Sequence, residues 1–322
     1  MDNITVLILA NPAERQLAML DQLPDSTSIA VGNTIEAFER AAPEAEVIYH
    51  ASAPGKLLRE VWALAPRVKW VQSRSAGLDS LLFPELVASP VLLTNGSGVF
   101  SQSLAEFVIG AAIFFAKDFR RLIRSQDAGV WDQFDNEEVR GKTMGIVGYG
   151  DIGHACARRA HAMGMRVLGL RRRPELSQGD PYISGVYGME QLLDLMPQCD
   201  YVVAAAPLAS GTLGLIGEAA LTAMKKTAVV MNVGRGPVID ETALIHALES
   251  GRIRGAALDV FENEPLPAGH PLFKLENVLL SPHCTDHTPT WLDDAMQFFI
   301  DQFARYTKGE PLKNIVDKKA GY

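Results

Sequence analysis

The sequence predicts an α/β fold made of two doubly wound domains, each with a parallel sheet. The chain has 322 residues, and at roughly 100 to 200 residues per domain this length favours two domains. Its composition, 48% hydrophobic and 21% charged, is that of an ordinary globular protein and excludes a disordered, collagen-like or coiled-coil chain. Short apolar runs recur in two series separated by polar stretches compatible with helices, a pattern typical of alternating strands and helices.

The first series of apolar runs is rich in Val and Ile and occupies residues 4–10, 29–31, 47–49, 68–71 and 91–93. Its spacing predicts βα repetition and a parallel sheet, because parallel neighbours need a crossover segment between them. The second series occupies residues 143–147, 166–170, 201–205, 227–233 and 255–260. It predicts a second, complete doubly wound domain.

Three longer segments are predicted to be helical. Residues 101–124 are apolar at more positions than one helical stripe needs, so we expect one helix buried between domains or against another subunit. Residues 154–163 follow the strand predicted at 143–147, and residues 291–306 carry apolar side chains at helical spacing. The last helix lies beyond the second domain and is expected to return and pack on the first.

Charge, apolar runs and cysteines exclude several classes of partner. With 30 Lys and Arg against 38 Asp and Glu the formal net charge is −8, which repels a phosphate backbone, so no nucleic acid is expected. The longest apolar run, residues 107–116, spans ten residues, about half of the roughly 20 that a membrane helix needs. The start lacks the basic region of a signal peptide. The cysteines, which show no C-x-x-C spacing, are Cys156, Cys199 and Cys284. We therefore expect a cytoplasmic chain without disulfides or metal.

A glycine-rich turn follows the strand predicted at 143–147. Gly148, Gly150 and Gly153 fit G-x-G-x-x-G, in which the first glycine permits the tight turn, the second lets the backbone approach a pyrophosphate, and the third lets helix and strand pack closely. The N-terminus of the following helix offers N–H groups and partial positive charge to phosphates. The context predicts dinucleotide binding; a tight βα turn without a ligand is the alternative.

Arginines occupy the position that distinguishes the two nicotinamide cofactors. In NAD-binding units an acidic residue at the end of the next strand binds the adenosine ribose. Here Arg171, Arg172 and Arg173 stand instead. Guanidinium groups suit an adenosine 2′-phosphate, and one charge-assisted hydrogen bond would favour NADP over NAD about ten- to hundredfold. A solvated basic turn is the alternative.

Three further polar clusters each follow an apolar run. They contain Arg235, Glu264 and His283. In a doubly wound sheet, loops after the strands meet at the carboxyl edge, where ligands bind. An Arg, a Glu and a His together at that edge suit the reduction of a 2-oxo acid.

These clusters, with the glycine turn and Pro207-Leu208 ahead of Thr212, resemble the D-isomer-specific 2-hydroxyacid dehydrogenase family. The resemblance covers nearly the whole chain. The arginine run makes the chain most similar to the NADPH-dependent glyoxylate and hydroxypyruvate reductases. It implies reduction of a small 2-oxo acid to the D-2-hydroxy acid by hydride transfer, with NADP(H) preferred and NAD(H) as a second cofactor. The alternative is a nucleotide-sensing protein like the corepressors on the same fold.

The resemblance also implies a role for each catalytic residue. Arg235 would hold the substrate carboxylate and polarise the C2 carbonyl. His283 would donate the proton to that oxygen, and Glu264 would bind the other ring nitrogen of His283, which fixes its tautomer and stabilises the protonated ring. Asp259 would contact the nicotinamide carboxamide. The loop Ser75, Ala76 and Gly77 would bind the substrate carboxylate through its backbone N–H groups.

The resemblance implies a larger set of cofactor-binding residues. They are Gly148, Gly150, Asp151, Ile152, Gly153, Arg171, Arg172, Arg173, Pro207, Thr212, Val233, Gly234 and Asp259.

The resemblance finally implies how the domains are arranged along the chain. A flavodoxin-like substrate domain takes residues 1–100 and 288–322, and a Rossmann cofactor domain, residues 101–287, is inserted into it. The apolar segment 101–124 corresponds to the dimer-forming element of the family, so a homodimer is expected.

Overall fold

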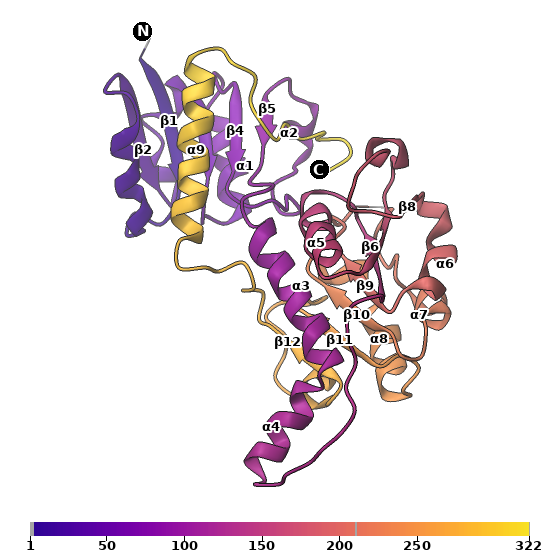
Figure 1. The fold of residues 1–322 in the computed structure, drawn as a ribbon. Helices are drawn as coiled ribbons and strands as arrows, with labels where there is room; N and C mark the ends of the chain where they lie inside the picture. The colour runs from indigo at the N-terminus through magenta and orange to yellow at the C-terminus, as the bar shows by residue number, and fades with distance from the viewer. Residues whose placement is uncertain (1–2, 210, 322) are drawn as a thin grey trace. The chain divides into compact units, whose positions relative to one another are not determined.

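The computed structural model describes residues 3–209 and 211–321. The chain divides into two compact units. Unit 1 comprises Met1–Phe100 and Pro289–Tyr322, and unit 2 comprises Ser101–Thr288. Each unit has its own parallel sheet (Figure 1), and the predicted α/β fold class with two doubly wound sheets is confirmed.

The sheet of unit 1 has five parallel strands in the flavodoxin-like order β2-β1-β3-β4-β5. The strands are β1 (Ile4–Leu9), β2 (Thr27–Gly32), β3 (Ala45–His50), β4 (Trp70–Ser73) and β5 (Leu92–Thr94). The order reverses between β1 and β3, the strands on either side of the switch point where ligands bind in such folds.

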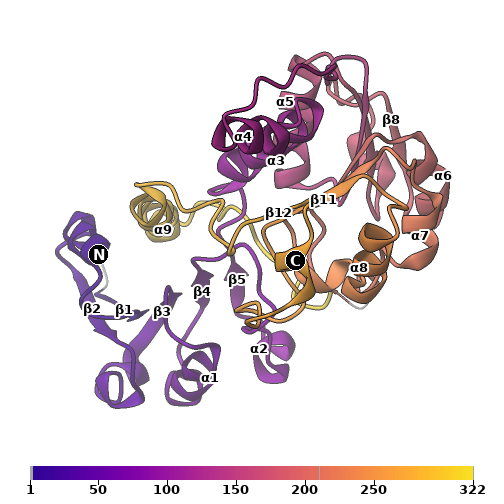
Figure 2. The ribbon, with the colours of Figure 1, turned by 90° about the horizontal axis from the view of Figure 1, so that it is seen from below.

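Helices cover both faces of this sheet, because successive strand residues point to opposite sides. Leu7 and Leu9 pack in one core with α1 (Gly55–Leu64) and α2 (Pro84–Ala88). Val6 and Ile8 pack in the other with α9 (Trp291–Thr307), and Figure 2 shows α1 and α9 on opposite faces. The 3₁₀ segments of this unit are η1 (Arg15–Gln22), η2 (Ile35–Ala37) and η3 (Ala42–Glu44).

Aromatic rings attach α9 to the sheet of unit 1. Phe299 stacks on Tyr49 with ring centroids 4.3 Å apart and lies 5.8 Å from Trp70. All three side chains are buried. The helix predicted at 291–306 therefore completes the core of the first unit, as expected.

The sheet of unit 2 has seven parallel strands in the order β12-β11-β10-β9-β6-β7-β8. This is a Rossmann order with one additional strand at its end. The strands are β6 (Thr143–Val147), β7 (Arg166–Leu170), β8 (Gly185–Tyr187), β9 (Tyr201–Ala204), β10 (Val229–Asn232), β11 (Gly255–Leu258) and β12 (Val278–Leu280).

Helices also lie on both faces of the unit 2 sheet (Figure 2). On one face are α3 (Ser101–Ala116) and α5 (Asp151–Ala162), and on the other are α6 (Leu192–Leu195), α7 (Glu218–Ala223) and α8 (Glu241–Glu249). The 3₁₀ segments of this unit are η4 (Pro174–Ser177), η5 (Met189–Gln191), η6 (Met196–Gln198), η7 (Gly236–Val238) and η8 (Pro271–Lys274). Within the residues that the structure describes, no helix is long and apolar enough to cross a membrane.

The prediction of one helix over residues 101–124 is wrong. The segment forms α3 and then α4 (Phe119–Asp127). Asp118 between them has φ 47°, in the left-handed region, and its side chain accepts a hydrogen bond from Arg121 N at 3.3 Å. An aspartate tolerates this conformation and caps the new helix, so the α3 ladder ends there.

The turn between β6 and α5 depends on two glycines that pack against backbone. Gly148 has φ 98°, and an added Cβ would lie 2.4 Å from Ala206 N; at Gly153 it would lie 2.6 Å from Gly148 O. Gly150 differs, because an added Cβ there would meet no described atom within 4 Å. Packing within the turn therefore requires glycine at 148 and 153. At Gly150 packing imposes no such requirement, and only a ligand that approaches the turn from solvent would.

We predict that Gly148→Ala lowers the stability of the protein by at least about 2 kcal/mol, since it combines left-handed strain with a backbone clash. For a domain of this size the loss corresponds to a fall in Tm of roughly 4–8 °C. The matched control is Gly150→Ala, which should change stability by no more than about 0.5 kcal/mol. Thermal melts of both variants test this, and equal Tm values would contradict it.

Candidate active site

The loops predicted to carry chemistry lie at the carboxyl edge of the unit 2 sheet. Because all its strands are parallel, the segments that follow β6, β7, β10, β11 and β12 leave from the same edge. These segments contain the glycine turn, the arginines, Arg235, Glu264 and His283.

His283 and Glu264 are in direct contact. His283 Nδ1 lies 2.6 Å from Glu264 Oε2, a short hydrogen bond between an imidazole and a carboxylate. The second carboxylate oxygen, Oε1, accepts a hydrogen bond from Phe261 N at 2.9 Å. The backbone therefore orients the carboxylate, and the carboxylate orients the ring with Nε2 left for other partners.

The loop that carries His283 is fixed by Asp259, whose side chain is only 1% exposed. Its Oδ1 accepts from Cys284 N at 3.1 Å and Thr285 N at 3.3 Å, and its Oδ2 accepts from Thr285 Oγ1 at 2.7 Å. Asp259 O accepts from His283 N at 2.9 Å. His283 is held at φ 52°, a left-handed conformation that a residue other than glycine keeps only where its surroundings impose it.

Arg235 lies between β10 and η7, next to the loop of Glu264. An added Cβ at Gly236 would lie 1.9 Å from the backbone of Phe261, so the two loops touch. Asn232 Nδ2 donates to Arg235 O at 3.0 Å, and Arg235 donates from one guanidinium nitrogen to Gly234 O at 2.8 Å. The structure thus brings the loops of Arg235, Glu264 and His283 together within unit 2.

The glycine turn fits a dinucleotide. The space beside Gly150 is open, as a close backbone approach to a pyrophosphate requires, and α5 begins directly after it. Asp151 and Ile152 form the first turn of that helix. Tyr149 lies between the first two glycines, and burial together with a 2.9 Å hydrogen bond to Asp180 raises the pKa of its hydroxyl.

The arginines begin directly after β7. Arg171 is half-buried and donates to Ser177 Oγ at 2.6 Å, while Arg172 and Arg173 are exposed. No sequence motif indicates Ser177, since only the fold of η4 brings its hydroxyl to the guanidinium. The arginines thus lie at the strand end where the adenosine ribose of a dinucleotide binds in such folds.

The remaining predicted cofactor residues follow β9 and β10. Thr212 donates to Pro207 O at 2.6 Å and accepts from Ala209 N at 2.8 Å, so its hydroxyl closes this turn. Val233 is buried, and Gly234 packs so closely that an added Cβ would lie 2.7 Å from Ala206 O. The loops after β9 and β10 are therefore in contact.

The predicted substrate loop lies in unit 1 after β4. Ser75 O accepts hydrogen bonds from Ser73 Oγ and Gly96 N, and Ala76 O accepts from Asn95 Nδ2 at 2.7 Å. Over residues 3–209 and 211–321, the N–H groups of Ser75, Ala76 and Gly77 donate no hydrogen bond to the backbone. The carbonyls of Ser75 and Ala76 accept hydrogen bonds, while the N–H groups of the loop remain available, as a carboxylate-binding loop requires.

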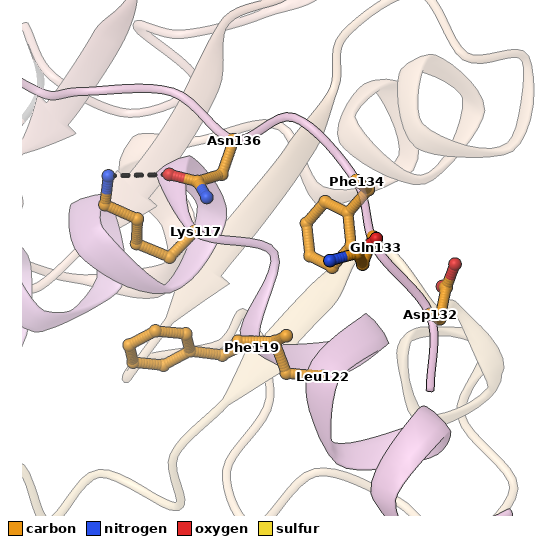
Figure 3. A pocket seen from close by; sticks show the side chains of 7 residues that line it. All are labelled: Lys117, Phe119, Leu122, Asp132, Gln133, Phe134 and Asn136. Carbon is orange, nitrogen blue, oxygen red and sulfur yellow. Dashed lines mark hydrogen bonds between the residues drawn. The ribbon is translucent and has the colours of Figure 1, made fainter. Parts of the chain in front are cut away.

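One cavity of unit 2 is lined by residues outside all these loops. It has a volume of about 410 Å³ and is formed by the end of α3, α4 and the chain at 132–136 (Figure 3). Lys117, on one side of it, donates to Asn136 Oδ1 at 2.8 Å. None of the predicted catalytic or cofactor residues lines it. In the described part of the chain, no group of three or more His, Cys, Asp or Glu side chains is placed to hold a metal ion.

Comparison with known proteins identifies the family. Residues 109–285 match the family described as D-isomer specific 2-hydroxyacid dehydrogenase, NAD binding domain. A glyoxylate reductase from Thermofilum pendens is 34% identical over 272 residues, which are 82% of this chain and 79% of that protein. A D-3-phosphoglycerate dehydrogenase from Methanocaldococcus jannaschii is 30% identical over 98% of this chain, which spans only 59% of the length of that relative.

A solved structure has the same fold over nearly its full length. It is an NADPH-dependent glyoxylate/hydroxypyruvate reductase from Sinorhizobium meliloti in complex with NADP and sulfate. Its TM-score is 0.84 at 26% identity, and the match covers 99% of this chain and 100% of that one. The chain described here therefore belongs to the D-isomer-specific 2-hydroxyacid dehydrogenase family, and residues 109–285 carry the NAD-binding domain of that family.

Proposed function

We propose that the protein reduces a small 2-oxo acid of the glyoxylate or hydroxypyruvate type to the D-2-hydroxy acid, with NADPH as the preferred cofactor. The observation that carries the proposal is the 2.6 Å hydrogen bond between His283 Nδ1 and Glu264 Oε2. It gives the loop after β12 an oriented acid–base group. Unit 2 serves as the cofactor domain, and unit 1 serves as the substrate domain.

In this proposal each polar group has one task in the reduction. A nicotinamide cofactor, when bound, supplies the hydride that adds to C2 of the substrate. His283 Nε2 donates the proton to the carbonyl oxygen as negative charge develops there, and Glu264 stabilises the ring while it is protonated. Arg235 binds the carboxylate and polarises the carbonyl, and the N–H groups of Ser75, Ala76 and Gly77 bind the carboxylate.

The cofactor preference rests on the arginines. Arg171, Arg172 and Arg173 stand where an acidic residue would serve NAD, and the contact of Arg171 with Ser177 adds a hydroxyl beside the guanidinium. Together they suit a 2′-phosphate, which is a dianion with several acceptor oxygens. Asp259 is proposed to bind the nicotinamide carboxamide, in addition to holding the His283 loop.

The proposed assembly is a homodimer formed through α4 and the chain that follows it. Exposed apolar side chains concentrate there, namely Phe119, Leu122, Ile123, Val130 and Trp131. Trp131 is 90% exposed, which is unusual for so large an apolar ring and typical of a partner-binding surface. By contrast, the apolar residues of α3 are largely buried, and we therefore place the proposed interface at α4 and the chain after it, at the end of the segment 101–124.

We predict a preference for NADPH over NADH. Replacing Arg171 and Arg172 together by Ala should raise KM for NADPH about ten- to hundredfold and leave KM for NADH nearly unchanged, because only the 2′-phosphate loses partners. Arg166→Ala, at the opposite end of β7, is the matched control. Steady-state kinetics with both cofactors test the prediction, and a wild-type protein that uses NADH as well as NADPH would contradict it.

We predict that His283 is the proton donor and Glu264 its positioning residue. His283→Gln should lower kcat by about 10² to 10⁴ while cofactor binding persists, since a positioned general acid is lost. Glu264→Gln keeps an acceptor but loses the charge that stabilises the protonated ring, so reduction should fail at a lower pH than in the wild type.

The measurement is the pH profile of kcat/KM for 2-oxo acid reduction in both variants. Near-normal activity of His283→Gln would assign the proton to another group. An alkaline limb that stays in place in Glu264→Gln would show that Glu264 does not stabilise the protonated form.

We predict a dimeric mass at micromolar concentration, measured by light scattering. Substituting Ile123 and Trp131 together by Asp should give a monomer, because two charges then replace exposed apolar side chains. Phe273→Asp is the control, since Phe273 is also exposed but belongs to η8. A monomeric wild type, or a double variant that stays dimeric, would contradict this interface.

A further inference from the structure

The switch point of the unit 1 sheet carries a cluster of polar side chains that the proposed mechanism does not use. The chain after β1 contributes Glu14, and the loop after β3 contributes Ser52. Arg74 follows β4 directly and precedes the loop Ser75–Gly77 in sequence. In flavodoxin-like sheets the carboxyl ends of the strands at the switch point are where ligands bind.

Glu14 is the centre of this cluster. Its Oε2 lies 3.5 Å from a guanidinium nitrogen of Arg74 and accepts from Gln16 Nε2, while its Oε1 accepts from Ser52 Oγ. The Glu14 and Arg74 side chains are only 16% and 15% exposed. Ion pairs at such burial are poorly screened by salt, so the loss of either partner leaves a strong uncompensated charge.

Arg74 is also fixed from other sides. Its guanidinium lies 5.3 Å from the ring centre of Trp291. Its backbone N–H donates to His50 O at 2.9 Å, and an added Cβ at Gly96 would lie 2.0 Å from its backbone carbonyl oxygen. The contacts to Glu14 and Trp291 thus hold the guanidinium in place, while the backbone of Arg74 is fixed at the end of β4, directly before the substrate loop in sequence.

His50 adds a group that lacks a partner in this region. It ends β3 and is only 7% exposed, and its Nε2 has no hydrogen-bond partner among the described residues. Burial, and to a smaller extent the charge of Arg74, lower the pKa of His50, which favours the neutral ring. The charge of this cluster is thus set by Glu14 and Arg74, and the buried Nε2 of His50 leaves a polar atom unpaired at the same strand end.

We propose that Glu14 determines substrate specificity: by neutralising Arg74, it makes the switch point of unit 1 select 2-oxo acids whose far end is uncharged and reject those with a second carboxylate. The inference rests on the proposed function, because it concerns the substrate of the same reaction. A second carboxylate would find Arg74 already paired and would lie beside the Glu14 carboxylate, so like-charge repulsion opposes its binding.

The experiment compares two substrates of nearly equal shape. Oxaloacetate carries a carboxylate where 4-methyl-2-oxopentanoate carries an isopropyl group, so the ratio of their kcat/KM values with NADPH measures recognition of the second charge. Glu14→Gln keeps the hydrogen-bonding shape and should raise the ratio about tenfold or more, because Arg74 becomes free to bind the carboxylate. Arg74→Gln leaves Glu14 unpaired and should lower the ratio of oxaloacetate to 4-methyl-2-oxopentanoate. The double variant should return this ratio toward the wild-type value.

The matched control is Glu85→Gln, which removes an exposed ion pair with Arg59 from the same unit and should leave the ratio unchanged. Where turnover of oxaloacetate is too slow, its competitive Ki against glyoxylate replaces kcat/KM. If Glu14→Gln shows no cooperative thermal transition and is therefore not folded, the fall in the substrate ratio expected for Arg74→Gln tests the role of the Glu14–Arg74 pair instead.

Activity with glyoxylate distinguishes a failure of the proposed function from a failure of the inference about Glu14. A wild-type protein that reduces no 2-oxo acid with NADPH overturns the proposed function and the inference together. A protein that reduces glyoxylate, with a substrate ratio that stays within twofold in Glu14→Gln and in Arg74→Gln, overturns the role of Glu14 alone.

Discussion

The buried carboxylate of Asp259 is the interaction on which the candidate active site depends. A carboxylate removed from water is strongly unfavourable unless donors surround it. Here two backbone N–H groups and one hydroxyl of the segment 284–285 supply the donors. Meeting this requirement brings the loop after β12 onto the end of β11 and keeps His283 left-handed. The position of the ring relative to Glu264 is thus a consequence of solvating a charge with protein groups.

The strands could be predicted from the sequence wherever a hydrophobic run was long and bounded. Residues 143–147 and 166–170 were predicted with the bounds that the structure has. The edge strand β8 was missed, since Gly185–Tyr187 contains only two apolar side chains and such a short run carries no periodicity. The equally short β5 and β12 were indicated by the apolar runs at 91–93 and ahead of His283. The break between α3 and α4 was also missed, because it depends on the left-handed backbone of Asp118 and not on hydrophobic pattern.

The site was predicted as a set of residue types but not as a network. Motif spacing indicated Arg235, Glu264 and His283, and the structure brings their loops together. The contacts that hold them come from pairs distant in sequence, such as Gly236 against Phe261 and Asp259 against Thr285. Such contacts depend on the order of strands in the sheet, which no local pattern encodes. The charge cluster at Glu14 was invisible for the same reason, since its members follow three different strands.

The packing of α9 on unit 1 has a consequence for how the protein is made. Ribosomes deliver the chain from its N-terminus, so Val6, Ile8, Tyr49 and Trp70 are synthesised long before Phe299 and Phe303, which cover them. Until then one face of the first sheet remains an open apolar surface, although the continuous unit 2 has already been synthesised. Completion of the first unit joins segments more than two hundred residues apart, a closure of high contact order and therefore a slow step.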